Sequence, residues 1–512
     1  MSSQSNGASN GHASPRLEDD LGLHYSGLSR PFDVGRYSVE SSAAFLRRIE
    51  IIHRKLVYLE AAHVVLRRLW ELKAALGRHL YEDAEAAAAL QERILDLRQN
   101  SGVLSREPDL RLSLFLDELL HAQTDEELLV GLYEILKPAL LDAQRTYVAS
   151  TQQIVDQPSV RLLRTTIADL EDQVAWGQRA VQTLVDERGR RPEVTEYVDR
   201  LRDYLVAAGG ITGEDPGATT TAGRRWRSVA TIDLPAKAIR DERMPAETTL
   251  FRVGIDQDTP HDDPIRRRLI HMMRVRQEEM VVAEVLAAVI WHKRDQPWEF
   301  TLDLARHEWD EMRHGLMGQA ALEAEGVPWM RYPQFTGDYD LNYTNVPEAQ
   351  YAWLLGIEQG AMKRTGKRAE FEFCRDEASH PLMTQFQDFD WADEVKHVHI
   401  GREWTTHLYD GDANQARAAA DRPLPSSGKM SMMPLWKRKA SCPGTARSKR
   451  APRDSQAETL FSVFSSARSQ SDTELACKRT TNHSVTPFPY HLPTGALHPR
   501  IVLKITPGLH PS

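Results

Sequence analysis

The stretch Asp310-Glu311-Met312-Arg313-His314 is followed later in the chain by a second of the same pattern, Asp393-Glu394-Val395-Lys396-His397. In each, a glutamate and a histidine three residues apart share one face of a helix, so each pair can offer a carboxylate and an imidazole to one ion. A lone glutamate precedes each pair: Glu279 lies 32 residues before Glu311, and Glu358 lies 36 residues before Glu394. This pattern is typical of a two-metal site in a four-helix bundle.

The spacing distinguishes these pairs from other matches to the bare motif, which are Glu50/His53, Glu60/His63, Glu118/His121 and Glu377/His380. In an antiparallel helical hairpin, two residues lie level only if the turn falls near the midpoint between them. The first midpoint is Asp295, just before the helix breaker Pro297, and the second is Asp376, in a polar stretch that ends at Pro381. At about 1.5 Å per residue each ligand lies roughly 20 Å from its turn, so all six can meet at one level.

Both lone glutamates have core-like surroundings, because apolar residues lie at helical spacing around Glu279 and Glu358. A buried carboxylate without a cationic partner is costly, and a metal ion is the simplest partner for four carboxylates and two imidazoles together. The alternative, solvated or ion-paired residues of an ordinary bundle, leaves the matched spacings as coincidence. Glu278 and Glu284 remain rivals for the first-helix ligand, although Glu284 is turned well away from Glu279 and is the less favoured.

At these residues, and through His399 to Gly401, the chain resembles the ferritin-like di-iron carboxylate superfamily. It is especially similar to an uncharacterised bacterial branch akin to a tRNA-modifying hydroxylase family. The resemblance covers about residues 265–412 and concerns the fold and the metal site, not the substrate. It implies metal ligation by Glu279, Glu311, His314, Glu358, Glu394 and His397, with Glu311 and Glu394 as bridging, catalytic ligands.

An internal repeat indicates that a second bundle precedes this one. Shifting the first hairpin back by 229 residues and the second by 224 aligns the six ligands with, in chain order, Glu50, Glu82, Glu85, Glu134, Leu170 and Gln173. Both histidines are replaced there, and the apolar Leu170 cannot ligate. We therefore expect a degenerate bundle without its metal pair; the alternative is a weak single-metal site formed by Glu50, Glu82, Glu85 and Glu134.

The sequence thus predicts an all-α chain of tandem ferritin-like four-helix bundles, the first degenerate, with disordered termini. A length of 512 residues exceeds the usual size of one core. The expected parts are a disordered segment 1–38, a degenerate bundle 39–190, a connector 191–264, a di-metal bundle 265–412 and a disordered basic tail 413–512. From Gly428 onward the chain has 13 Lys plus Arg against 4 Asp plus Glu and no sustained periodicity, which is typical of an unfolded segment.

Composition favours a cytoplasmic protein. Only Cys374, Cys442 and Cys477 occur, so no disulfide framework is available. No apolar run approaches the roughly 20 residues of a membrane span, and no secretory signal precedes the first bundle. The net charge of -9 disfavours broad binding to nucleic acid.

Two further residues near the ligands have two interpretations each. His307, one turn before Glu311, lies beside the ligands or is an ordinary surface or capping histidine. Tyr351, two turns before Glu358, approaches the metals as a radical or proton donor or, the favoured interpretation, packs in the core.

A mixed carboxylate and imidazole set suits two iron ions, or manganese, better than a thiolate-preferring metal. We therefore expect an oxidoreductase, such as a monooxygenase, that activates O2 to oxidise a small organic substrate. Its electrons would come from an external donor such as a ferredoxin or a reductase. The alternatives are a non-catalytic metal-binding or storage protein and a helical interaction scaffold.

Overall fold

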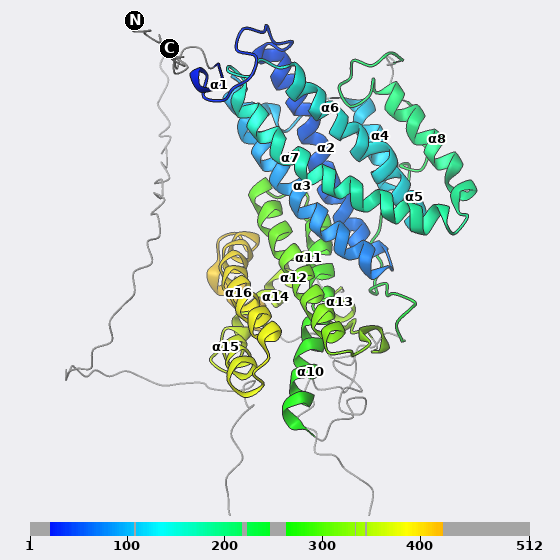
Figure 1. Cartoon of the computed structure of the whole chain (residues 1–512). Helices are drawn as coiled ribbons and strands as arrows, with labels where there is room; N and C mark the ends of the chain where they lie inside the picture. Colours follow the sequence, from blue (N-terminus) through cyan, green and yellow to red (C-terminus); the bar gives the residue numbers. More distant parts are fainter. Residues whose placement is uncertain are drawn as a thin grey trace, which may run out of the picture. The chain divides into compact units, whose positions relative to one another are not determined.

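The computed structural model describes residues 21–106, 109–217, 223–245, 263–332, 334–343 and 346–422 (Figure 1), and every regular element in these ranges is a helix. These residues belong to one compact unit. The prediction of an all-α protein is therefore confirmed for this part of the chain. Within it, no helix combines the length and the apolar composition needed to cross a bilayer.

Four long helical segments make up the first bundle: α2 (Val39–Leu66), α3 (Trp70–Asp96), α5 (Asp125–Val130) continued through the π-helical η3 (Gly131–Leu136) into α6 (Lys137–Ser150), and α7 (Gln157–Val181). Ser38 begins α2 with a capping box, its hydroxyl accepting from Ser41 N while its own backbone N–H donates to the Ser41 hydroxyl. The helices pack in the order expected of a bundle, α2 on α3, α3 on α7 and α7 on α6.

Two more helices, α4 (Leu110–Leu120) and α8 (Arg191–Ala207), extend this bundle. α8 packs against α4 and α5 and buries Val194, Tyr197, Val198 and Leu201. The predicted boundary at 190 therefore falls too early, because the first 17 residues of the predicted connector form a helix of this bundle. Short helical turns complete the region: α1 (Leu21–His24), η2 (Ser101–Val103) and η4 (Gln182–Asp186).

The second bundle is formed by α10 (Pro264–Gln277) with α11 (Met280–His292), α12 (Trp298–Ala324), α14 (Pro347–Ala361) with α15 (Lys367–Glu372), and α16 (Pro381–Leu408). α12 packs against α10, α11 and α16, and α14 packs against α11 and α16. Minor helices are η5 (Trp329–Arg331), α13 (Gly337–Asn342), η6 (Phe373–Glu377) and α17 (Ala413–Ala420).

Apolar residues three and four apart run through 266–293 and through 347–374, a pattern that by itself predicts two continuous helices; the structure interrupts both. The predicted helix 266–293 is broken at Glu278 and Glu279, where the Glu279 N–H donates to Arg276 O, one residue short of the α-helical partner. The predicted helix 347–374 is broken at 362–366, a stretch that ends in Gly366, and only then resumes as α15. Apolar periodicity on both sides of a break cannot reveal the break itself.

Both predicted disordered ends contain ordered residues. α17 lies beyond the predicted boundary at 412 and packs on α14, where a Cβ at Gly356 would lie 2.2 Å from Ala420 O. At the other end, the ring of Tyr37 stacks on that of Tyr147 at 4.4 Å. The bundles therefore extend past both predicted limits, while 1–20 and 423–512 lie outside the described residues.

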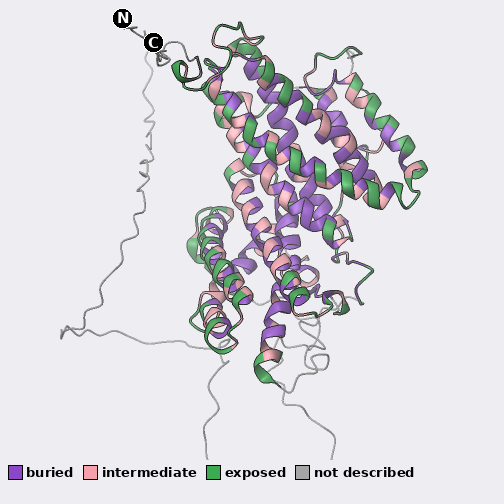
Figure 2. Cartoon of the chain, viewed as in Figure 1, coloured by how far each residue is buried: buried purple, intermediate pink, exposed green. Residues whose placement is uncertain are grey.

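The bundles contact each other through α2 with α11 and α3 with α12. Figure 2 shows buried residues along these helices, and α11 buries all but two of its 13 residues. Lys73 of α3 forms a buried ion pair with Glu284 of α11, and a Cβ at Gly77 would lie 2.7 Å from the Met312 side chain. Burial on both faces explains why α11 has no polar side and reads as apolar all round.

Candidate metal centre

Both glutamate–histidine pairs point into the second bundle from unbroken helices. Glu311 and His314 lie mid-way along α12, and Glu394 and His397 lie on α16. All four are at most 3% exposed. The three-residue spacing thus turns each pair toward the facing helix, as expected from the 3.6-residue period.

The lone glutamates come from the interrupted segments. Glu279 immediately precedes α11, and its side chain is 15% exposed. Glu358 lies in the last turn of α14 and is 3% exposed. Each broken segment therefore supplies one carboxylate at its break, while the straight helices supply the pairs.

The six predicted ligands belong to overlapping groups of buried side chains, and Glu311 lies between the two motif histidines. His314 Nδ1 lies 3.4 Å from Glu279 Oε2 and 3.6 Å from Glu311 Oε2. His397 Nδ1 lies 3.3 Å from Glu311 Oε1 and 3.9 Å from Glu394 Oε2. The two oxygens of Glu311 thus face different imidazoles, as a carboxylate between two ions would.

The outer nitrogen of each histidine faces an aspartate on the opposite helix. His397 Nε2 on α16 lies 3.3 Å from Asp310 Oδ2 on α12, and His314 Nε2 on α12 lies 3.4 Å from Asp393 Oδ2 on α16. Arg313 donates to both aspartates. An aspartate at Nε2 orients the ring and leaves Nδ1 for the interior, an arrangement that commonly supports a metal-bound histidine.

Several buried atoms of the cluster have no hydrogen-bond partner: Glu279 Oε2, His314 Nδ1, Glu394 Oε2 and His397 Nδ1. Buried polar atoms are normally paired, and an unpaired one is costly. These atoms belong to four of the predicted ligands and are the atoms that face the cluster interior. Two ions, one beside Glu279 and His314 and one beside Glu394 and His397, would satisfy them, and their nitrogen and oxygen chemistry fits iron or manganese.

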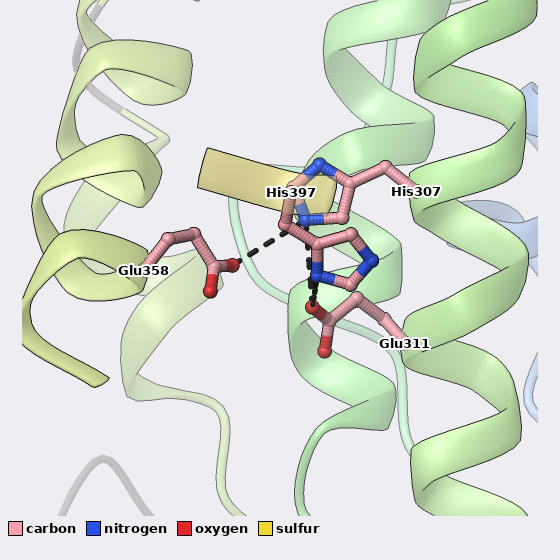
Figure 3. Close-up of side chains that lie close together, drawn as sticks. All are labelled: His307, Glu311, Glu358 and His397. Atoms are coloured by element: carbon pink, nitrogen blue, oxygen red, sulfur yellow. Dashed lines mark hydrogen bonds and ion pairs between the residues drawn. The ribbon is translucent and has the colours of Figure 1, made fainter. Parts of the chain in front are cut away.

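Two additional residues complete the cluster, each one turn before a motif glutamate. His307 Nε2 lies 3.4 Å from Glu358 Oε1 and 3.5 Å from Glu311 Oε1, and Figure 3 shows these side chains with His397 turned toward one another. Asp390 Oδ1 lies 3.4 Å from His314 Nδ1. The structure thus places His307, which the sequence left open, among the candidate ligands, and adds Asp390. The signal for Asp390 was its position four residues before Glu394, matching His307 before Glu311.

Two buried cations that sequence reasoning missed lie against the carboxylates. Lys367 Nζ, at the start of α15, lies 2.7 Å from Glu394 Oε1, 2.8 Å from Asp390 Oδ1 and 3.7 Å from Glu279 Oε1. Arg276 of α10 lies 2.6 Å from Asp390 and 3.0 Å from Glu279. These cations compensate part of the negative charge of the cluster.

Electrostatics divides the cluster into ionised and neutral groups. Burial and the neighbouring Glu394 and Glu311 raise the pKa of Glu358 well above its usual value. Burial opposes ionisation of Glu311 as well, but the surrounding histidines outweigh it and hold its pKa well below normal. Burial lowers the pKa of His397, but Asp310 and Glu311 raise it to about 9. Glu311 is therefore ionised in the metal-free cluster, whereas Glu358 is neutral.

The rivals for the first-helix ligand face elsewhere. Glu284 pairs with Lys73 and, at 2.6 Å, with Arg240. Glu278 pairs with Arg274 at 2.9 Å. Of the three glutamates near the start of α11, Glu279 is the one that enters the cluster.

The first bundle does not assemble the alternative single-metal site. The carboxylates of Glu50, Glu82, Glu85 and Glu134 each have a separate partner, in chain order Arg47, Arg78, Tyr81 and Arg191. The centre of this bundle instead holds Lys137, whose ammonium group lies 2.8 Å from Glu60 and 3.0 Å from Asp83 and donates to Gln173 at 2.6 Å. Gln173, which the internal repeat aligns with the ligand His397, is thus a hydrogen-bond partner of Lys137.

Tyr351 lies in the core and points toward no ligand oxygen within hydrogen-bond distance. Its hydroxyl has no partner among the described residues, and its ring packs edge-on against Phe300 at 6.3 Å. This geometry agrees with the packing interpretation.

Comparisons of the chain with protein-family models, with characterised proteins and with solved structures give no significant match.

Proposed function

We propose that the second bundle is a ferritin-like di-metal centre and that the protein is an O2-dependent oxidoreductase with an organic substrate. The observation that carries the proposal is a set of buried candidate ligands from four helical segments, several of which have ligand atoms without a hydrogen-bond partner. Two iron ions, or an iron and a manganese ion, would supply the redox chemistry by which O2 oxidises a substrate.

The side chains divide the work between holding and orienting. Glu311, with an oxygen toward each imidazole, and Glu394, between His397 and Lys367, are the candidate bridging and catalytic residues. Glu279 and His314 would hold one ion, and Glu358 and His397 the other. Asp310 and Asp393 fix the histidine rings so that Nδ1 remains directed inward.

Exposure differs across the centre and indicates a direction of access. The Glu358 side chain is 4% exposed and both motif histidines are fully buried, whereas the Glu279 side chain is 15% exposed. We therefore propose that small molecules reach the centre from the Glu279 side, at the break between α10 and α11. The electrons for the reaction would come from a separate reductase or ferredoxin.

The alternative is a metal-binding or storage protein without catalysis. The near-complete burial of Glu311, Glu358 and His397 favours it, because a closed site retains metal but admits substrate poorly. The measurements described next separate the two functions.

Metal analysis and an optical spectrum of aerobically purified full-length protein test the proposal. We expect about two iron or manganese ions per chain, since only the second bundle offers a full ligand set. O2 consumption with a chemical reductant then distinguishes catalysis from storage. Metal-free protein that also fails to take up Fe²⁺ or Mn²⁺ would contradict the proposed centre, and loaded protein that consumes no O2 would leave the metal-binding function.

A further inference from the structure

The candidate centre contains two unequal halves. Subsite 1 consists of His307, Glu311, Glu358 and His397 and offers two imidazoles and two carboxylates. Subsite 2 combines two groups that overlap at His314, Glu279–Glu311–His314 and His314–Asp390–Glu394; besides Glu311, which it shares with subsite 1, it offers one imidazole and three carboxylates. The bundle therefore presents a nitrogen-richer and an oxygen-richer position to incoming ions.

Subsite 1 has no permanent cation of its own. Among the described residues, neither Glu311 nor Glu358 forms an ion pair with a lysine or an arginine; the nearby nitrogens belong to His307, His314 and His397. A histidine nitrogen can bind a metal ion directly once its ring is neutral, so an imidazole proton is released when an ion enters but no side chain has to move away.

Subsite 2 already contains a cation. The Lys367 ammonium group is within ion-pair distance of all three of its carboxylates. Its contact with Asp390 is to Oδ1, the oxygen that also lies 3.4 Å from His314 Nδ1. The ammonium group and an ion bound to His314 would thus compete for this oxygen.

The break before α15 is what places Lys367 here. Lys367 follows Glu358 by nine residues, which on a continuous helix is about two and a half turns and would put the lysine on the opposite face. The interruption at 362–366 turns the lysine back into the bundle, where it is 4% exposed. Its charge is satisfied by the subsite, since its ion pairs are with Glu279, Asp390 and Glu394.

We propose that Lys367 is an internal cation that competes with metal for subsite 2, so that the centre fills in two unequal steps, subsite 1 first. This inference rests on the proposed metal-binding function and adds the order of assembly. An ion entering subsite 2 must displace the ammonium group from Asp390 and Glu394, whereas an ion entering subsite 1 displaces no lysine or arginine; release of an imidazole proton is common to both steps. Arg276 remains beside Asp390 and Glu279 and further weakens the second step.

Titration of metal-free full-length protein with Co²⁺, followed by calorimetry and by cobalt absorption, tests the order of filling. In the wild type we expect the second ion to bind at least about tenfold more weakly than the first, given the strength of close buried charge pairs. Lys367→Met should narrow this gap in affinity between the two ions, because the second ion then binds more tightly. Arg368→Met is the matched control, because Arg368 is the next residue but is exposed and pairs with Glu372; its gap should equal that of the wild type.

His307→Ala provides the complementary change and should weaken the first step more than the second. If Lys367→Met does not fold, Lys367→Gln keeps a polar side chain without the charge and should narrow the gap in the same direction. The wild-type titration decides independently of any variant. Two ions of equal affinity, or an unchanged gap in the folded Lys367 variants, would overturn the unequal filling and leave the metal centre standing. A wild type that binds no Co²⁺ would overturn the proposed function itself.

Discussion

The centres of the two bundles are occupied in different ways. In the first, the Lys137 ammonium group forms an ion pair or a hydrogen bond with each of Glu60, Asp83 and Gln173, and one oxygen, Glu60 Oε2, has no hydrogen-bond partner. In the second, Lys367 lies among carboxylates beside several buried ligand atoms that have no hydrogen-bond partner. A helical bundle can thus neutralise interior carboxylates with an amine alone, or leave room for an ion, and the unpaired atoms distinguish the two cases.

The largest expected difference is in metal content. His397→Ala or Glu311→Ala should abolish binding of the metal pair, because each removes a ligand from a shared site, while helicity measured by far-ultraviolet circular dichroism stays largely intact. Gln173→Ala, at the aligned position of the first bundle, should leave metal content unchanged. Equal metal content in all variants and the wild type would remove the distinction between the bundles.

The second expected difference is in stability. Lys137→Met leaves two buried carboxylates without their cation and should lower the free energy of unfolding by about 3–5 kcal/mol. Added metal should not restore it, since this bundle has no set of unpaired ligand atoms comparable to that of the second. Urea denaturation with and without Mn²⁺ measures both effects, and rescue by Mn²⁺ would show that the first bundle also retains a metal site.

Close helix packing gives a smaller effect on stability, which one glycine substitution in each bundle can test. A Cβ at Gly318 would lie 2.1 Å from Gln277 N, so Gly318→Ala should push α10 from α12 and cost about 2 kcal/mol. Because this contact is two residues from Glu279, metal binding should weaken too. In the first bundle, a Cβ at Gly177 would lie 2.0 Å from the Tyr133 ring. Gly177→Ala should therefore lower the free energy of unfolding without changing metal affinity. Thermal unfolding and metal titration of both variants test this; a Gly318→Ala protein with normal metal affinity would contradict the link.

The smallest expected effect is on the stability of the first bundle at acidic pH. Burial raises the pKa of Asp109, but hydrogen bonds from Arg111 and Arg48 outweigh it and lower the pKa to about 2. This contribution is present above the unfolded-state value of about 3.8 and is lost as pH falls through about 2. Because Asp109 is partly solvated, we expect it to be worth about 1 kcal/mol. Asp109→Asn should remove this part of the pH dependence of stability, measured by denaturant titration of metal-free protein between about pH 4 and pH 2. If the pH dependence is unchanged in this variant, other groups cause it.

The sequence predicted the six convergent residues because their spacing depends only on helical period and turn position. It also contained the signal for α8, since Val194, Tyr197, Val198 and Leu201 are three and four residues apart. Lys367 could not be found in this way: its approach depends on the break at 362–366, and a continuous helix would have faced it outward. The tandem ferritin-like arrangement and the metal ligation remain predictions from the pattern.

The reciprocal pairing of Asp310 with His397 and of Asp393 with His314 makes the ligands of α12 and α16 depend on each other. A substitution at either aspartate frees the histidine ring on the opposite helix to rotate. A change in one motif therefore also disturbs a ligand of the other motif. In the first bundle both histidines and one aspartate are replaced: Tyr81 stands where Asp310 aligns, and Glu85 and Gln173 stand where the histidines align. Asp169 remains where Asp393 aligns, but it has no aligned histidine to orient.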